Sequence, residues 1–137
     1  MIDTNQVVLK YLSTPSAVTN PLLALVSDRI YCPYAPENAS MPNLTFFTRG
    51  GTSTPYIPDI SKPSLQFDCW AANSVDARNV YRKLYDALQG IQNINVTIGA
   101  STYVILSARE EVQGQDLIDD SIPGRFRVLT FFEIQIK

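Results

Sequence analysis

The sequence predicts an α+β fold, in which an antiparallel or mixed β-sheet carries helices packed on one face. Apolar stripes with a helical period, and several segments that alternate between apolar and polar residues, predict this class. Their order along the chain is two helices, two strands, one helix and three strands, which favours helices gathered on one side of a sheet. The 137 residues suffice for one domain with its own core, so we expect a single domain spanning 1–137.

Two short helices are predicted near the N-terminus. Residues 6–12 place apolar side chains on one side, residues 3–5 offer polar caps, and Pro15 breaks the pattern. A second helix is expected from Asn20-Pro21, because proline is tolerated in the first turn of a helix. Residues 28–31 then leave this helix in an extended stretch.

The centre of the chain predicts a strand followed directly by the longest helix. Residues 64–72 alternate like a strand with one side in a core, and Cys69 lies on that side as a small buried hydrophobe. Residues 75–89 have a helical period, with Asn73 or Ser74 as the cap and Gly90 just past the end. One stripe of this helix is apolar and consists of Ala77, Val80, Tyr81, Leu84 and Leu88.

The other strands and two loops complete the prediction. Segment 50–63 contains two glycines and three prolines, so we expect a long exposed loop or extended arm rather than a strand pair. Segment 113–121 is acidic and is expected to be a mobile loop. Alternation predicts strands at 44–49, 94–98, 102–112 and 125–137, of which the second and third form a hairpin.

The alternation also assigns side chains to the two faces of the sheet. The face opposite the helices collects large apolar side chains, and burying each of them would contribute about 1.5–3 kcal/mol. We therefore expect a subunit interface there, although the N-terminal segment or the 50–63 arm could cover the face instead, or a strand register could be misassigned. The expected interface residues are Trp70, Tyr103, Ile105, Leu129 and Phe131.

Composition excludes several kinds of chemistry. The chain has no histidine, which removes His-based acid–base catalysis and most zinc sites. Gly50-Gly51 lacks the flanking residues of a phosphate-binding loop, and the aspartates near position 119 lack the spacing of a calcium loop. Cys32 and Cys69 are too far apart for a CxxC motif; two free thiols are favoured, with a disulfide left open. We expect no catalytic residues, cofactor or metal, and no enzyme activity.

Charge and hydropathy limit the partners. A formal net charge of −2 gives no general attraction to nucleic acid or to anionic membranes. No apolar run is long enough to span a bilayer, and residues 1–6 lack the features of a secretory signal. We expect a soluble protein that is made in a cytoplasm, with neither a membrane nor a DNA sequence as its target.

The central strand and helix resemble those of one protein family. Residues 65–71 (Leu-Gln-Phe-Asp-Cys-Trp-Ala) and 86–90 (Asp-Ala-Leu-Gln-Gly) are similar to the corresponding segments of tail-terminator, or tail-completion, proteins of long-tailed bacteriophages and gene-transfer particles. The layout of the two N-terminal helices fits as well. The resemblance covers most of the chain and consists of patterns of residue type rather than invariant motifs.

The resemblance implies a virion protein of the neck, assembled in the host cytoplasm. It would form a ring, commonly a homo-hexamer, that caps the tail tube protein and receives the head connector or stopper protein, with DNA only as cargo passing through the lumen. Alternatives are another head–tail joining component, a stopper or adaptor, and a small cytoplasmic protein-binding module. The arm, the acidic loop and their surroundings would make the axial contacts, through Arg49, Tyr56, Ile57, Asp116, Asp119 and Asp120.

Overall fold

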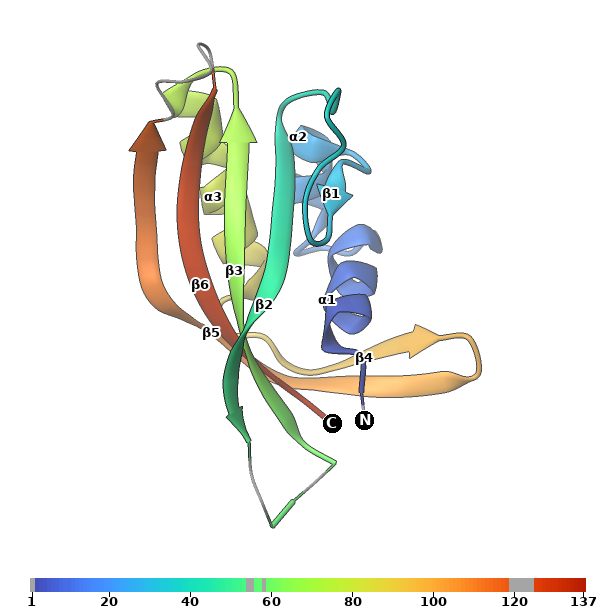
Figure 1. Ribbon diagram of the computed structural model, residues 1–137. Helices are drawn as coiled ribbons and strands as arrows, with labels where there is room; N and C mark the ends of the chain where they lie inside the picture. Colours follow the sequence, from blue (N-terminus) through green and yellow to red (C-terminus); the bar gives the residue numbers. More distant parts are fainter. Residues whose placement is uncertain (1, 54–55, 58, 119–124) are drawn as a thin grey trace.

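The computed structural model describes residues 2–53, 56–57, 59–118 and 125–137, and it confirms the α+β class. Its helices are α1 (Thr4–Ser13), α2 (Asn20–Val26) and α3 (Ser74–Leu88). Its strands are β1 (Ile30–Tyr31), β2 (Asn43–Ser53), β3 (Ser61–Ala71), β4 (Gln92–Ile98), β5 (Ser101–Ile118) and β6 (Phe126–Ile136) (Figure 1).

The strands form one mixed sheet in the order β1-β2-β3-β6-β5-β4. The short β1 runs parallel to β2, and the other neighbouring strands are antiparallel. The sheet curls into a half-barrel, and the helices lie on the same face of it (Figure 1). This leaves the opposite face of β2, β3 and β6 without a helix, and we call it the outer face.

The helix boundaries follow the predicted caps. The side chain of Asn73 accepts a hydrogen bond from the backbone N–H of Asp76 at 2.8 Å, and that of Asp3 accepts one from Gln6 at 3.3 Å. Gly90 has a φ of 80°, the left-handed conformation predicted after the end of α3. Every residue of the predicted apolar stripe of α3 is buried.

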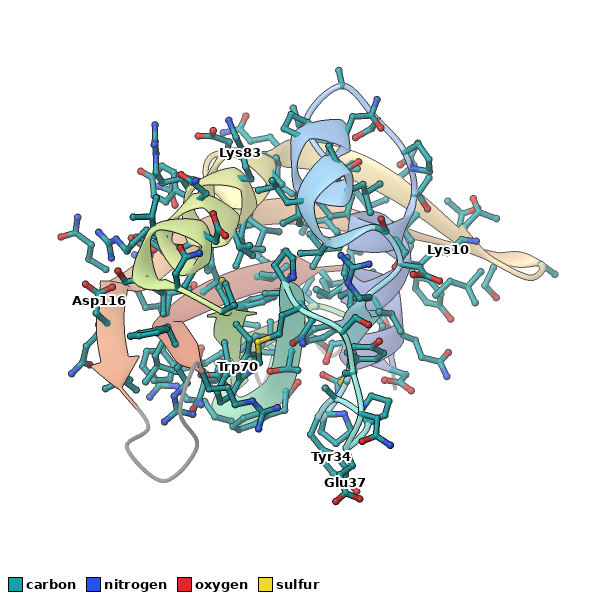
Figure 2. All side chains as sticks on the ribbon, turned by 90° about the horizontal axis from the view of Figure 1, so that it is seen from above. Lys10, Tyr34, Glu37, Trp70, Lys83 and Asp116 are labelled. Carbon is teal, nitrogen blue, oxygen red and sulfur yellow. The ribbon has the colours of Figure 1, made fainter. Side chains whose placement is uncertain are left out.

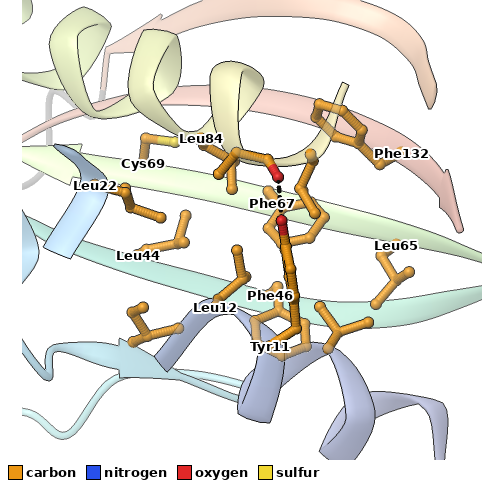
Figure 3. Close-up of a cluster of buried hydrophobic side chains, with 14 of the residues drawn as sticks. Tyr11, Leu12, Leu22, Leu44, Phe46, Leu65, Phe67, Cys69, Leu84 and Phe132 are labelled. Carbon is orange, nitrogen blue, oxygen red and sulfur yellow. Dashed lines mark hydrogen bonds between the residues drawn. The ribbon is translucent and has the colours of Figure 1, made fainter. Parts of the chain in front are cut away.

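The core lies between the helices and the inner face of the sheet (Figure 3). The ring of Phe67 stacks on Phe46 at 5.4 Å and meets Phe132 edge-on at 5.7 Å, so that β2, β3 and β6 are joined through aromatic contacts. The hydroxyl of Tyr11 donates to the backbone carbonyl of Ala87 at 2.7 Å and ties α1 to the end of α3.

The structure confirms the prediction of which side chains of β3 and β6 face the core. Leu65, Phe67, Cys69 and Ala71 are buried, and along β6 every second residue from Val128 to Ile136 is buried. Cys32 and Cys69 are free thiols, as favoured from the sequence.

The prediction that 50–63 is not a strand pair is wrong. Strands β2 and β3 continue into it, with Gly51 opposite Pro63 and Thr52 opposite Lys62, and they project from the body as a hairpin arm (Figure 1). Gly51 permits this pairing, since its φ is 131° and a Cβ there would lie too close to the carbonyl oxygen of Lys62.

The prediction of a loop from position 113 is also wrong, because β5 continues to Ile118. Residues 54–55, 58 and 119–121 of these two segments lie outside the described residues.

The predicted place of Tyr103 and Ile105 on the outer face is wrong. Ile105 is fully buried in the core, and Tyr103 is half-buried and packs against the core. The cause is a β-bulge in β5. Ile105 lies opposite Ile136 and Ser107 lies opposite Gln135, so β5 contains one more residue than β6 at this point. Since side chains alternate with a period of two, the extra residue reverses the sides of the residues before it.

Candidate interaction surface on the outer face

Three of the predicted interface residues lie on the outer face of adjacent strands. Trp70 of β3 lies opposite Arg127 of β6, while Leu129 and Phe131 of β6 lie opposite Asp68 and Gln66 of β3. The side chains of Trp70, Leu129 and Phe131 are half-buried. These three residues, together with Arg49, Arg125 and Arg127, are called the outer patch below.

Arginines cover the aromatic rings of the outer patch. The guanidinium carbon of Arg49 lies 3.9 Å from the centre of the Phe131 ring. Those of Arg125 and Arg127 lie 5.1 Å and 5.3 Å from the Trp70 ring. Such cation–π contacts contribute about 0.5–1 kcal/mol at exposed sites. The surface is therefore a mixed aromatic and cationic one.

Polar contacts hold Arg49 in this position. Its Nε donates to the hydroxyl of Ser64 at 3.0 Å, and that hydroxyl donates to Glu111 at 2.6 Å. Further along, Arg109 and Glu133 form an ion pair at 3.2 Å between β5 and β6. The outer face thus has its own network of polar and charged contacts.

Asp68 is a carboxylate buried on the outer face. Only 5% of the residue is exposed. Gln66 Nε2 donates to its Oδ2 at 3.3 Å, whereas Arg127 Nη1 lies 3.7 Å from Oδ1, close enough for an ion pair and too far for a hydrogen bond. Burial raises the pKa of Asp68, and the charge of Arg127 and the Gln66 hydrogen bond offset this only in part.

A pocket of about 340 Å³ opens beside Asp68, between the outer face and residues 33–35. Asn43, which is 1% exposed, lies in its wall and donates from Nδ2 to the carbonyl oxygen of Ser40 at 3.1 Å. Trp70 donates from its indole N–H to the hydroxyl of Thr45 at 3.1 Å, which fixes the ring at the edge of the pocket. The lining consists of Pro33, Tyr34, Ala35, Asn43, Thr45, Phe47, Asp68, Trp70 and Arg125.

Figure 2 shows Tyr34 and Glu37 on the segment that projects beside β2, on the side of the sheet away from the helices. This segment, and not the 50–63 arm, shares the pocket with Trp70. Sequence reasoning missed the pocket. The sign of such a site in the sequence was a pair of polar residues: Asn43 directly precedes the predicted strand 44–49, and Asp68 lies within the predicted strand 64–72.

The residues expected to make axial contacts lie at different places. Tyr56 and Ile57, in the turn of the arm, are 93% and 48% exposed. Asp116 is near the C-terminal end of β5, and Figure 1 shows this end of β5 at the opposite end of the sheet from the arm. Its carboxylate forms an exposed ion pair with Arg78 of α3 at 3.4 Å. Arg49 belongs to the outer patch, and Asp119 and Asp120 lie outside the described residues.

Within the described ranges, no three His, Cys, Asp or Glu side chains gather in a way that could hold a metal ion. No helix of the described part of the chain has both the length and the apolar character needed to cross a membrane. No protein-family model matches the chain, and no curated protein matches it by sequence. Interpretation of the site therefore depends on its geometry.

Proposed function

We propose that this protein is a structural, non-enzymatic component of a virion neck, a tail terminator that forms a ring on the end of a tail tube and provides the docking surface for the head. The observation that carries the proposal is the outer patch, where Trp70, Leu129 and Phe131 lie on a sheet face that no helix covers. Aromatic residues and arginine are enriched at protein interfaces. The family resemblance of residues 65–71 and 86–90 supplies the kind of assembly.

The proposed partners are other copies of the chain, the tail tube protein and the head connector or stopper protein, with DNA passing through the ring as cargo. The exposed Tyr56 and Ile57 on the arm, and Asp116 near the opposite end of the strands, support contacts in two axial directions. A ring component needs one surface for contacts with neighbouring subunits and two opposite ends for contacts with other proteins. The outer patch and these two ends fit that requirement.

The proposal is tested by removing the aromatic anchors of the outer patch. We expect the double variant Trp70→Ala/Phe131→Asp to stay folded and to lose both self-association and binding to tail tubes. Light scattering gives the mass in solution, and negative-stain imaging with purified tail tubes shows whether a ring forms at their ends.

A matched control keeps the added charge away from the patch. Val75, at the start of α3, is 67% exposed, so Val75→Asp adds the same carboxylate without touching the outer face. We expect it to assemble like the wild-type chain. A folded double variant that assembles normally would refute the interface assignment. A wild-type chain that stays monomeric at high concentration with tail tubes present would refute the ring, and would favour a protein-binding module that uses the pocket beside Trp70.

A further inference from the structure

Strand β4 forms an edge of the sheet, and part of its backbone faces away from the other strands. No strand of the described residues lies beyond β4. Val104 of β5 exchanges both of its backbone hydrogen bonds with the residue that follows β6, at 2.9 and 3.1 Å. Because such bonds alternate along an antiparallel ladder, the residues on either side of Val104 bond to Ile94 and Val96 of β4. The N–H and C=O groups of Asn95 and Thr97 therefore point away from the sheet, and we call this stretch of β4 the open edge.

Helix α1 lies beside the open edge but does not close it (Figure 1). A groove of about 290 Å³ separates the last turn of α1 from β4, and residues 94–97 form one wall of it. Tyr11 and Lys10 of α1 line the opposite wall, and Figure 2 shows Lys10 next to the projecting hairpin of β4 and β5. Asn95 and Thr97 are exposed, so a ligand can reach their backbone from solvent.

The β4–β5 hairpin lacks the features that usually protect an edge strand. Proteins guard open edges with charged side chains, prolines and bulges, because an unpaired backbone accepts another strand. The chain has 11 basic residues, 13 acidic residues and 9 prolines, yet residues 91–108 contain none of them. The pairing of β4 with β5 is also regular from Ile94 to Ile98. An accessible edge without such protection indicates that another strand pairs with it.

A second copy of this chain has no suitable strand to offer in its described part. All six strands of the described residues are already paired in the sheet. The unpaired segment 32–42 contains Pro33, Pro36 and Pro42, which have no N–H to donate to a ladder. The groove is also bounded by α1, so it admits a single strand and not the edge of a second sheet with its helices. The added strand therefore belongs to a different protein.

The residues around the groove define the chemistry of that strand. The outward N–H and C=O groups of Asn95 and Thr97 match the backbone of an extended peptide, and an apolar side chain of the peptide would lie against Tyr11. Lys10 is the only charged residue among the described ones that line the groove, so it favours a carboxylate on the partner. We propose that the open edge binds an extended, acidic segment of another protein, which adds to the sheet as a further strand beside β4. The inference does not depend on the proposed function.

A phage-displayed library of random peptides provides the probe. The library is selected on the full chain, after removal of the phage that bind the Asn95→Pro variant. We expect enriched sequences in which an acidic residue lies among alternating apolar residues. The most enriched peptide is then synthesised with a fluorescein label, and fluorescence anisotropy gives its affinity. Failure to enrich any peptide, or enrichment of basic peptides, would overturn the proposal.

Two substitutions at one position show whether the backbone of β4 makes the contact. Asn95→Pro removes the outward N–H and no hydrogen bond to β5, so the variant should stay folded. We expect it to weaken peptide binding about tenfold or more, because a ladder hydrogen bond is lost and the proline ring blocks the edge. Asn95→Ala keeps the N–H and should bind like the wild-type chain. Circular dichroism establishes that both variants are folded, and wild-type affinity in folded Asn95→Pro would refute the open edge as the site.

Amide hydrogen exchange, measured by NMR, tests the mode of binding. In the free protein the amides of Asn95 and Thr97 should exchange fast, and those of Ile94 and Val96 slowly. The bound peptide should slow the first pair about tenfold or more and leave the second pair slow. Unchanged exchange of the first pair would contradict strand addition. If the first pair is already protected in the free protein and light scattering shows a dimer, a second copy occupies the edge and the proposal is wrong.

The charge of the partner is tested at Lys10. We expect Lys10→Gln to weaken binding of the selected peptide about twofold to fivefold, the effect of an exposed ion pair. Lys83→Gln removes a lysine of α3 that lies outside the groove, and it should bind like the wild-type chain. An unchanged affinity in Lys10→Gln would contradict the acidic character of the partner.

Discussion

Replacing Gly114 by alanine tests how the bulged part of β5 fits against α3. The pairing of β5 with β6 shifts register between Val112 and Gln115, and Gly114 lies within this irregular stretch. The Tyr81 ring of α3 lies directly on Gly114. A Cβ at this position would lie 2.6 Å from Cζ of Tyr81 and 2.8 Å from Cε1 and Cε2.

The Tyr81 ring has little freedom to move away. Its hydroxyl donates to Glu110 Oε2 at 2.7 Å and accepts from the backbone N–H of Gly114 at 3.0 Å. Glu110 Oε2 also accepts a hydrogen bond from the hydroxyl of Thr130 at 2.8 Å, and this contact with β6 holds the Glu110 carboxylate in place. Relieving the contact requires a shift of roughly 0.8 Å to reach ordinary van der Waals distance, which would stretch both hydrogen bonds of the hydroxyl.

These contacts set the expected magnitude. Overpacking a well-packed site costs about 1–3 kcal/mol, and each weakened hydrogen bond adds about 0.5–1.5 kcal/mol. We therefore expect Gly114→Ala to lower the free energy of unfolding by at least about 2 kcal/mol. Urea denaturation followed by circular dichroism measures it, and Gln113→Ala, an exposed neighbour, serves as the control and should stay within about 0.5 kcal/mol of the wild type.

Repeating the substitution in a Tyr81→Ala variant distinguishes a steric clash with the ring from strain in the backbone. Gly114 is not among the residues with positive φ, so alanine can adopt its backbone conformation. In Tyr81→Ala the ring is absent, and Gly114→Ala should then be neutral or stabilising by about 0.4–1 kcal/mol. If Gly114→Ala leaves the wild-type stability unchanged, or costs the same with and without the Tyr81 ring, the explanation is refuted.

Three further outcomes follow from buried groups. Tyr11→Phe should lower the free energy of unfolding by about 1–3 kcal/mol in urea, because the buried carbonyl of Ala87 loses its donor; an unchanged stability would contradict this. Because burial raises the pKa of Asp68, its contribution to stability is present below the unfolded pKa of about 3.9 and is lost as pH rises through the folded pKa. The stability of the wild type minus that of Asp68→Asn should therefore fall from about pH 4 to pH 7, and a difference independent of pH would contradict the raised pKa. Because burial raises the pKa of the Cys69 thiol, iodoacetamide should leave Cys69 unmodified in the native protein and alkylate it in urea, as intact mass shows; native alkylation of Cys69 as fast as that of Cys32 would contradict its burial.

The sequence was a good guide where one side of an element is buried along its whole length. Strand β6 and helix α3 show this, because the period is uninterrupted and the residues that face the core are apolar, Thr130 of β6 excepted. The caps at Asn73 and Asp3 were also predictable, since a local side chain supplies the missing acceptor. These elements needed no knowledge of distant contacts.

The errors occurred where backbone pairing, and not side-chain pattern, determines the structure. The bulge beside Ile105 adds one residue to β5 and leaves no mark in the composition, so a strict period of two assigned the wrong side. The arm is paired through backbone hydrogen bonds in a segment rich in glycine and proline, which has the composition of a loop. For the same reason, the place of Trp70 could be predicted, but its pocket with residues 33–35 could not, because that pocket depends on packing between distant segments.

The charges of the outer patch bear on which assembly it can form. A two-fold contact through this face would set Arg49, Arg125 and Arg127 of one copy against the same arginines of the other, and like charges in an interface are unfavourable. A contact between this face and a different surface of the next copy avoids that repulsion, and repeated contacts of this kind close into a ring or grow into a filament. The arginines therefore favour the proposed ring over a simple dimer. Arg49 lies on the Phe131 ring, and Arg125 and Arg127 both lie on the Trp70 ring. A neighbouring subunit that offers carboxylates could pair with these guanidinium groups and leave Trp70 and Phe131 to be buried at the contact.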